Sequence, residues 1–342
     1  MENNKLKLSI KTLQNIFSNT EEPTWFLNTR KLALYRSYTL PFPKLESMNL
    51  DSWNLFNIDF STLRLEEMNT LDISNYGLEQ DDFAIVQKNN TVVHVSIPEK
   101  YRDKVIIKDI FSAMNDDHIK DSFMSVVDYA ENKVTAVHYT LLNAGLFIDV
   151  KENIVIEEPL QYIVISDKEQ SLFNHVTINV GENSTFNFIE NYINTTKEDK
   201  APFSFVAEVV THEGAKINYS SITNQPREKR GTILRRGLTF KNSLINWNVA
   251  AMDEADVYHD NTTNILGDGS EANLKIVTLG VKEQKTYFNS EVVNQGLSSK
   301  GDILQHGVLL DKSHIVFNGV GFIVKGATGS NAYQSSRMLT LS

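Results

Sequence analysis

A weak internal repeat in the second half of the chain constrains the fold more than any other feature of the sequence. At intervals of 28 to 31 residues, a polar turn is followed by a small residue that opens a segment of alternating apolar and polar residues. Repeated units of this kind are typical of a β-solenoid, in which strands of adjacent coils stack in parallel and their inward side chains form apolar ladders. The copies begin at Ser184, Ala215, Ser243, Ala272 and Gly301, and the spacing continues to Ala332.

A second, looser series lies between these copies, so each period is expected to contain at least two strands and two turns. Its members begin at Gly231, Ala255, Lys285 and Ser313. An antiparallel sandwich is the competing fold, because it also alternates short strands with turns, about every 8–12 residues. That fold needs hairpins, yet the common hairpin pairs Asn-Gly and Asp-Gly occur only at Asn318-Gly319 and Asp268-Gly269. The repeat therefore favours a right-handed parallel β-helix.

The N-terminal part of the chain has a different pattern of apolar residues, and it predicts a helical arm over residues 1–80. Apolar residues at helical spacing predict two helices in the first 40 residues, and the second must end before Pro41. Residues 44–80 are polar and aperiodic, which indicates an ordered but irregular arm.

Residues 81–145 are predicted to form a small α+β lead-in to the solenoid. A strand pair is expected around the turn at Lys88-Asn89-Asn90, and helices are expected over 109–114, 117–129 and 134–143. The remaining residues, 146–342, contain almost only short β-type runs and are predicted to be the β-helix core, so the chain is mainly β.

Composition excludes several classes of function. The formal net charge of −10 argues against a nucleic-acid surface. The one dense basic stretch, residues 227–236, is interpreted as a solvated, ion-paired strand edge. The chain contains no cysteine, which excludes disulfides, thiolate catalysis and cysteine metal sites. Its first residues do not have the basic-then-apolar pattern of a signal peptide, and no apolar run approaches the roughly 20 residues that span a bilayer. We therefore expect a cytoplasmic protein without nucleic-acid or membrane partners.

Paired carboxylates are the chemistry that polysaccharide lyases and hydrolases with a β-helix fold require. The densest acidic cluster runs from Asp253 to Asp260, and alternation places Asp256, Tyr258 and Asp260 on one face of a strand. This cluster is a candidate acid/base or metal site, and a solvated outer face is the other interpretation. A carbohydrate-active enzyme is therefore the alternative function.

The remaining sequence motifs predict no catalytic residue. The eight histidines are scattered without metal-ligand spacing, and a structural role is expected for each. His306 and His314 flank a strand–turn–strand unit and could approach one another across coils. No glycine-rich nucleotide loop or activated nucleophile is present. The residues by themselves thus predict an acidic β-solenoid with helical attachments and no visible active site.

Three stretches of the sequence resemble one known family. They are Glu22-Pro23-Thr24-Trp25-Phe26-Leu27-Asn28-Thr29-Arg30 with Pro41-Phe42-Pro43, then Tyr139 to Ile148 with Ile154 to Gln161, and finally Ser299 to Leu304 with Phe317-Asn318-Gly319 and Gly329 to Leu339. Together they are similar to the SufB/SufD family of iron–sulfur cluster assembly scaffolds. Within that family, the lack of cysteine makes the chain more similar to SufD than to SufB. Thiolates are the natural ligands of iron–sulfur clusters, and SufB would be expected to supply them.

The resemblance implies a non-enzymatic scaffold subunit of the SUF assembly complex. Such a subunit pairs with a SufB-like paralogue and with a SufC-like ABC ATPase, which hydrolyses the ATP. No cofactor is expected on this chain alone, although the full complex would hold an iron–sulfur cluster transiently. A homodimer is the expected alternative when the chain is alone.

Pairing is expected through edge strands of the late coils, which are templates for strand addition. The candidate interface residues are Ser313, His314, Val316, Asn318, Asn331, Tyr333, Ser335 and Arg337. Family members continue past this region into a helical segment that carries a histidine motif. Here that motif would lie beyond Ser342, so no metal ligand is assigned and a missing C-terminal segment is expected.

Overall fold

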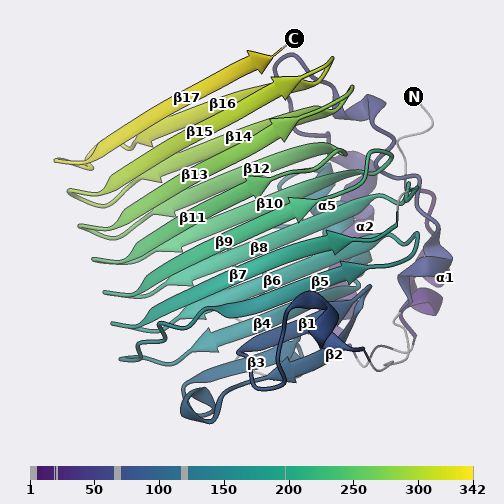
Figure 1. Cartoon of the computed structure of the whole chain (residues 1–342), viewed down its shortest axis with the longest axis horizontal. Helices are drawn as coiled ribbons and strands as arrows, with labels where there is room; N and C mark the ends of the chain where they lie inside the picture. Colours follow the sequence, from purple (N-terminus) through teal and green to yellow (C-terminus); the bar gives the residue numbers. More distant parts are fainter. Residues whose placement is uncertain are drawn as a thin grey trace.

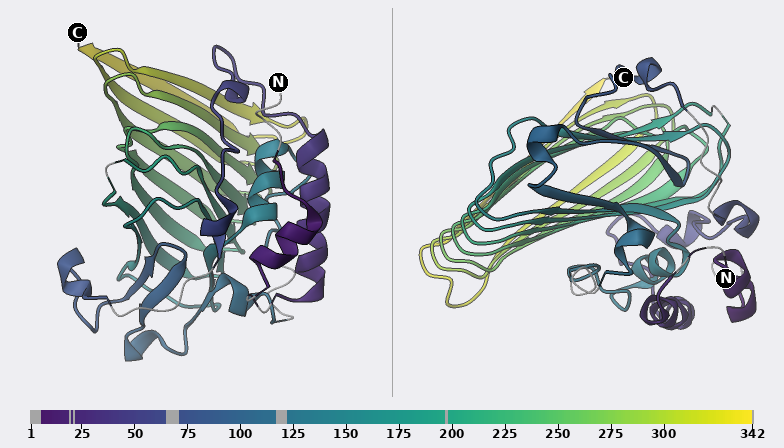
Figure 2. Two further views of the ribbon diagram at one scale, coloured as in Figure 1. Left: turned by 90° about the vertical axis from the view of Figure 1, so that its right-hand side faces the viewer. Right: turned by 90° about the horizontal axis from the view of Figure 1, so that it is seen from below.

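The computed structural model describes residues 6–18, 20, 22–64, 71–116, 122–196 and 198–341. The strands form two long sheets, and successive strands along the chain are added to these sheets from one end of the molecule to the other (Figure 1). Seen from below, the sheets form a flattened tube with the N-terminal helices along one side (Figure 2). The predicted parallel β-helix is confirmed.

The described part of the chain forms seven coils, and each coil contributes one strand to each sheet. We call the sheet that the helices cover the inner sheet and the other the outer sheet. The inner sheet contains β4 (Ala144–Val150), β6 (Leu172–Val180), β8 (Phe203–Thr211), β10 (Arg230–Thr239), β12 (Asp256–Ile265), β14 (Lys285–Asn294) and β16 (His314–Ile323). The outer sheet contains β5 (Leu160–Ser166), β7 (Thr185–Asn194), β9 (Lys216–Asn224), β11 (Leu244–Ala251), β13 (Glu271–Gly280), β15 (Lys300–Leu310) and β17 (Asn331–Leu341).

The register between coils follows the predicted repeat at all but one step of the main series. Lys216 lies opposite Leu244, as the spacing predicts, but Leu244 lies opposite Glu271. Ala272 is therefore paired with Ile245, and the predicted alignment of Ala272 with Ser243 is wrong by two residues. A shift of two residues keeps every side chain on its own face, so alternation alone does not reveal it.

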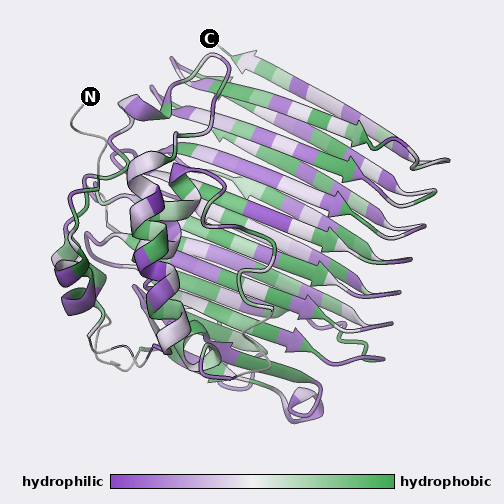
Figure 3. Cartoon of the chain, turned by 180° about the vertical axis from the view of Figure 1, so that it is seen from behind, coloured by the Kyte–Doolittle hydropathy of each residue, from purple (hydrophilic) through white to green (hydrophobic). Residues whose placement is uncertain are grey.

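Apolar ladders fill the space between the two sheets. Hydrophobic and hydrophilic residues alternate along the strands (Figure 3). In the outer sheet, Phe188, Tyr219 and Trp247 stack from coil to coil, with ring centroids 5.1 and 4.8 Å apart. All three are almost fully buried. Burial of this kind is the main favourable contribution to the stability of the coils.

The turns of the coils place asparagine and glycine on top of one another. Asn183 has a φ of 55°, and Gly214 of the next coil has a φ of 70°. A Cβ atom at Gly214 would lie 2.5 Å from Oδ1 of Asn183. Asparagine tolerates the left-handed region better than most residues, and glycine enters it without steric cost. This stacking explains why small and polar residues recur at the turns.

Three further strands of the described residues extend the N-terminal end of the solenoid, and only one of them is parallel to the coil strand beside it. The predicted hairpin is confirmed as β1 (Ala84–Lys88) and β2 (Thr91–Ser96), which are antiparallel. β1 continues the outer sheet parallel to β5, and β2 is the last strand of that sheet. β3 (Val105–Asp109) ends the inner sheet, antiparallel to β4.

Helices and an irregular arm cover the inner sheet. Among the described residues, the α-helices are α1 (Ile10–Ile16), α2 (Thr24–Thr39), α3 (Ile110–Ala113) and α5 (Lys133–Leu141), and the 3-10 helices are η1 (Leu50–Ser52), η2 (Phe60–Leu63), η3 (Ile73–Tyr76) and η4 (Glu99–Tyr101). Their apolar side chains bury Val206, Leu234 and Tyr258 on the outward side of the inner sheet. None of the helices within the described ranges has both the length and the apolar character needed to cross a membrane.

One predicted helix of the lead-in is not found in the part of it that the structure describes. Residues 117–121 of the predicted helix 117–129 lie outside the described residues, and residues 122–129 form turns and bends. The backbone N–H groups of Val126 and Val127 donate to the Glu208 carboxylate of β8 instead of to helical carbonyls. The predicted helices at 109–114 and 134–143 correspond to α3 and α5.

Candidate functional site: the open end of the solenoid

The last coil of the solenoid is open in the described part of the chain. β16 and β17 are the final strands of their sheets, and each is paired on one side only (Figure 1). Ile315 and Phe317 point into the coil but are only partly buried, whereas the equivalent Phe288 one coil earlier is fully buried. The inward side of the last coil and the backbone edges of two strands are therefore available for contact.

Large apolar side chains are exposed along both edge strands. They are Val320, Phe322, Ile323, Tyr333, Met338, Leu339 and Leu341, with exposed fractions from 37% to 59%. Such a concentration of exposed apolar residues on two unpaired strands is typical of a protein–protein interface. An edge of this length is also a template for pairing with another chain.

Two rows of hydrogen-bonded polar side chains, which we call polar ladders, end at the same coil. On the inner sheet, Nδ2 of Asn318 donates to Oδ1 of Asn289 at 2.8 Å, and Nδ2 of Asn289 donates to Asp260 at 3.1 Å. Inside the coils, Gln305 accepts from Ser290 at 2.9 Å and donates to Ser336 at 3.0 Å. Because Asn318 and Ser336 lie in the last coil, a partner that continues the solenoid would meet these polar groups.

The structure brings the eight predicted interface residues together at this end. His314, Asn331, Tyr333 and Arg337 are exposed. Ser313, Val316, Asn318 and Ser335 are half-buried, and Val316 packs against the N-terminal arm. Their role in binding a partner stays a prediction.

The acidic cluster does not form an exposed pair of carboxylates. Asp253 is buried and accepts from the Thr223 hydroxyl at 2.7 Å and from the Gln225 N–H at 2.8 Å. Burial raises the pKa of Asp253 to about 6, although these hydrogen bonds oppose the shift. The interpretation of the cluster as a solvated outer face is therefore wrong for this residue.

Asp260 has a different environment, on the side of β12 that faces the helical cover. It is buried, and its carboxylate lies 2.8 Å from the Arg236 guanidinium. Burial alone would raise the pKa of Asp260, but the ion pair with Arg236 holds it below its ordinary value. Across the described ranges there is no group of three or more histidine, aspartate or glutamate side chains that could hold a metal ion.

The basic stretch is ion-paired as predicted, but its central residues are not solvated. Lys229, Arg235 and Arg236 are all buried. Lys229 forms an ion pair with Asp199, and Arg236 bridges Asp260 of its own sheet to Glu131 of the cover. The interpretation as a solvated edge is therefore wrong for these three residues.

A buried charge also lies inside the coils. Arg235 points inward and donates to Ser221 at 2.7 Å and to Asn261 at 3.3 Å, and it lies 3.9 Å from the Glu190 carboxylate. Burial raises the pKa of Glu190 against the opposing attraction of Arg235. Sequence reasoning missed this cluster, although a charged residue at an inward position of a strand is a signal that could have found it.

Two histidines that are distant in the sequence meet between the cover and the solenoid. Nε2 of His138 in α5 lies 3.2 Å from Nδ1 of His175 in β6, and Nε2 of His175 lies 3.2 Å from Glu208. Ser204 contacts Nδ1 of His138 at 3.0 Å and accepts from Thr232. Ser204 can donate to Nδ1 of His138, an arrangement that suits a neutral imidazole with its proton on Nε2.

The environment of His138 explains its neutral form. Burial lowers the pKa of His138 well below its ordinary value, and the electrostatic influence of the neighbouring His175 and Arg30 lowers it further. By contrast, His306 and His314 lie on strands of different sheets, and no hydrogen bond or ring contact of the described side chains joins them. The expected approach of these two histidines is not observed.

Comparisons with known proteins agree on one family. The family model described as "SUF system FeS cluster assembly, SufBD core domain" matches residues 163–342, which include every coil strand from β6 to β17. The "Iron-sulfur cluster assembly protein SufD" of Bacillus subtilis (strain 168) is 34% identical over 351 residues, which cover 99% of this chain and 80% of that protein.

More distant relatives carry the same family description. The "Iron-sulfur cluster assembly SufBD family protein SSP1857" of Staphylococcus saprophyticus is 23% identical, over 94% of this chain and 73% of that protein. The "Iron-sulfur cluster assembly SufBD family protein SAR0880" of Staphylococcus aureus (strain MRSA252) is 22% identical with the same coverage. The similarity thus extends over the N-terminal cover as well as the coils.

Proposed function

Since the chain belongs to the SufBD family of iron–sulfur cluster assembly proteins, we propose that it is a SufD-like scaffold that joins a SufB-like paralogue through its open last coil. The sequence motifs predicted this family. The chain's part in iron–sulfur cluster assembly follows from the family. The partner and the surface that binds it are the proposal.

The observation that carries the proposal is that β16 and β17 are each paired on one side only among the strands that the structure describes. A partner that adds strands to β16 and β17 would satisfy their backbone edges and cover the exposed apolar side chains around Phe322 and Leu339. It would also continue the polar ladders that end at Asn318 and Ser336. A partner of the same solenoid fold fits these requirements, because it can present two edge strands at the same spacing.

The chemistry of the sequence supports a division of labour between subunits. The sequence has no cysteine, so the thiolate ligands of a transient iron–sulfur cluster would come from the partner subunit. It also has no glycine-rich nucleotide loop, so ATP hydrolysis is assigned to a SufC-like ABC ATPase. We therefore propose a non-catalytic role in the cytoplasm for this chain.

Co-expression with the SufB-like and SufC-like proteins of the same organism tests the proposal. The tagged chain is captured, and the complex is measured by size-exclusion chromatography with light scattering. We expect a complex that contains the SufB-like protein, and we expect the double variant Phe322→Lys with Leu339→Lys to lose it. Ile222→Lys is the matched control, because Ile222 is exposed on β9, far from the last coil.

The outcomes separate the surface from the partner. If the double variant still captures the SufB-like protein at wild-type yield, the last coil is not the interface. If the wild-type chain forms a stable homodimer and captures no paralogue, the heteromeric assembly is wrong, and the open coil serves self-association instead.

A further inference from the structure

The opposite end of the solenoid also finishes in a strand with one unpaired side. β2 is the last strand of the nine-stranded outer sheet and is hydrogen-bonded to β1 alone among the strands that the structure describes. Its outer N–H and C=O groups form a second template for strand addition. Val95, near the end of β2, has an exposed fraction of 51%.

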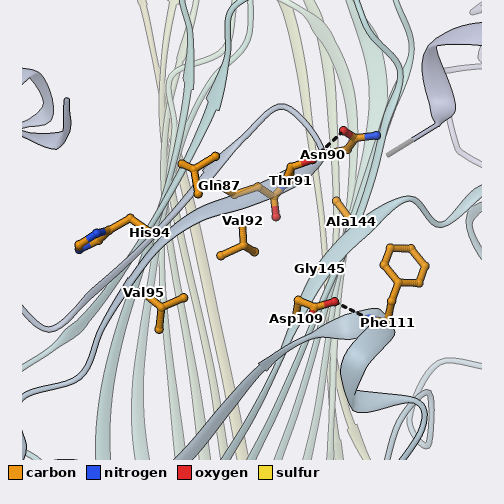
Figure 4. Close-up of a pocket in the computed structure, with 11 residues that line it drawn as sticks. Gln87, Asn90, Thr91, Val92, His94, Val95, Asp109, Phe111, Ala144 and Gly145 are labelled. Atoms are coloured by element: carbon orange, nitrogen blue, oxygen red, sulfur yellow. Dashed lines mark hydrogen bonds between the residues drawn. The ribbon is translucent and has the colours of Figure 1, made fainter. Parts of the chain in front are cut away.

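An apolar cavity of about 390 Å³ opens beside this strand. Val92 and Val95 of β2 line one side of it, and Phe111 and Ala144 line the facing side (Figure 4). The lining surface is mainly apolar, and its polar residues are Gln87, Asn90, Thr91, His94 and Asp109. The cavity therefore suits an apolar side chain that approaches along the edge of the strand.

An acidic groove of about 870 Å³ follows at the C-terminal end of the same strand. It shares His94 and Val95 with the apolar cavity and continues past Ser96. Asp81 and Glu99 lie in its wall, and the single cation in the wall, Arg102, already pairs with Glu99 at 2.7 Å. Asp81 is exposed and has no ion-pair partner among the described side chains, so the groove has an excess of negative charge.

We propose that the β2 edge binds an extended peptide by strand addition, with an apolar residue in the cavity and a lysine or arginine in the groove. The peptide backbone pairs with the free side of β2, as in other complexes that extend a sheet by one strand. At about 3.3 Å per residue, a peptide that runs along β2 reaches from the cavity to the groove within about four residues. The occupant is therefore a peptide segment of a partner protein in which an apolar and a basic residue are this close together.

This inference does not depend on the proposed pairing at β16 and β17. The two ends of the solenoid are separate surfaces, so loss of one contact leaves the other unchanged. Val95→Lys alters β2 without touching the last coil. Failure of peptide binding would therefore say nothing against a complex with a SufB-like protein.

The test uses a panel of fluorescent eight-residue peptides that alternate apolar residues with threonine and carry one lysine. The apolar residue is valine, leucine or phenylalanine, and the lysine position is varied. Binding is followed by fluorescence anisotropy and by hydrogen exchange of the full chain. We expect saturable binding that slows exchange of those β2 amides between Val92 and Ser96 that point away from β1 by about tenfold or more, because they become paired. A peptide with two central prolines should not bind, because proline cannot donate to the ladder.

Three variants assign the contact. Val95→Lys should weaken binding by at least about tenfold, because a charged residue on an edge strand opposes pairing. Asp81→Lys should weaken binding of the lysine peptide and reduce its salt dependence. Val155→Lys is the matched control, because Val155 has an exposed fraction of 59% and lines neither space, and it should bind like the wild type.

Several results would overturn the proposal. One is the absence of saturable binding by any peptide of the panel, and another is binding that Val95→Lys leaves unchanged. A third is protection that appears in segments other than β2. A concentration-dependent dimer that Val95→Lys dissociates would show that a second copy of the chain, and not a peptide, covers this edge.

Discussion

Removing the charge of one buried carboxylate should make the protein more stable at neutral pH. Asp253 is 2% exposed and has its pKa raised to about 6, against 3.8 for an ordinary aspartate. The variant Asp253→Asn keeps the shape of the side chain. Its carbonyl oxygen can accept from the Gln225 N–H, and its amide can donate to the Thr223 hydroxyl, so it mimics the protonated acid.

The magnitude follows from the linkage between proton binding and folding. Between pH values of about 4 and 6, the unfolded chain releases the proton of Asp253 before the folded chain does. The stability that this group contributes is therefore complete below the unfolded pKa and is lost as the pH rises through the folded pKa. A shift of about 2 pKa units corresponds to about 3 kcal/mol. The variant should match the wild type near pH 4 and exceed its free energy of unfolding by about 3 kcal/mol above pH 7.

Urea unfolding at several pH values measures this difference. The fluorescence of Trp247, which is buried in the strand that leads to Asp253, reports the state of the coil. Dilute protein is required, because the sequence pI is about 5.3. Asp302→Asn is the control: Asp302 is exposed on β15, so its variant should follow the wild type at every pH.

Two results would refute the reasoning. A difference between wild type and Asp253→Asn that does not change with pH would mean that burial does not raise the pKa of Asp253. A variant that is less stable than the wild type at neutral pH would mean that the attraction of Arg235 for the carboxylate outweighs the cost of burying its charge.

Two further predictions concern the cover and the turns. Arg30 donates to Glu22 at 2.9 Å and to the Thr140 carbonyl at 2.9 Å, and so holds α2 against the end of α5. Arg30→Met should lower the free energy of unfolding in urea by about 3–5 kcal/mol, because it leaves Glu22 buried and unpaired. Recovery of most of that loss by adding Glu22→Leu would confirm the cause, and an unchanged loss would contradict it. Gly214→Ala should lower the melting temperature more than Gly77→Ala. Both glycines have a positive φ, but only a Cβ at Gly214 meets a neighbour within 4 Å. An equal drop in melting temperature for the two variants would show that backbone strain alone decides the effect.

The candidate interface illustrates how far the sequence could be interpreted without the structure. The resemblance in residues 299–339 predicted the late coils as the pairing surface, and the structure places all eight predicted residues there. It did not predict that Phe322, Leu339 and Leu341 would be exposed together. Their exposure depends on which strands end the sheets, and that is a property of the stack and not of any one segment. For the same reason, the edge at β2 was not recognised.

The sequence by itself determined the solenoid and the facing of its strands. A period of 28 to 31 residues with alternation inside each copy is local information, and it also marks the polar turns and the all-strand character of the described residues after Gly145. Local patterns were less decisive in the lead-in. Apolar residues at helical spacing in 117–129 predicted a helix, but Glu208, 82 residues beyond Val126, takes up the backbone N–H groups that such a helix would have used.

Tertiary structure alone decided the register of Ala272, the burial of Asp253 and Arg235, and the meeting of His138 with His175. A two-residue shift of register leaves the hydrophobic pattern unchanged, so only the contacts of neighbouring coils select it. A charged residue has the same identity in the sequence whether it faces solvent or a partner inside the coil. Its environment depends on side chains from other coils and from the cover, and these come together only when the chain folds.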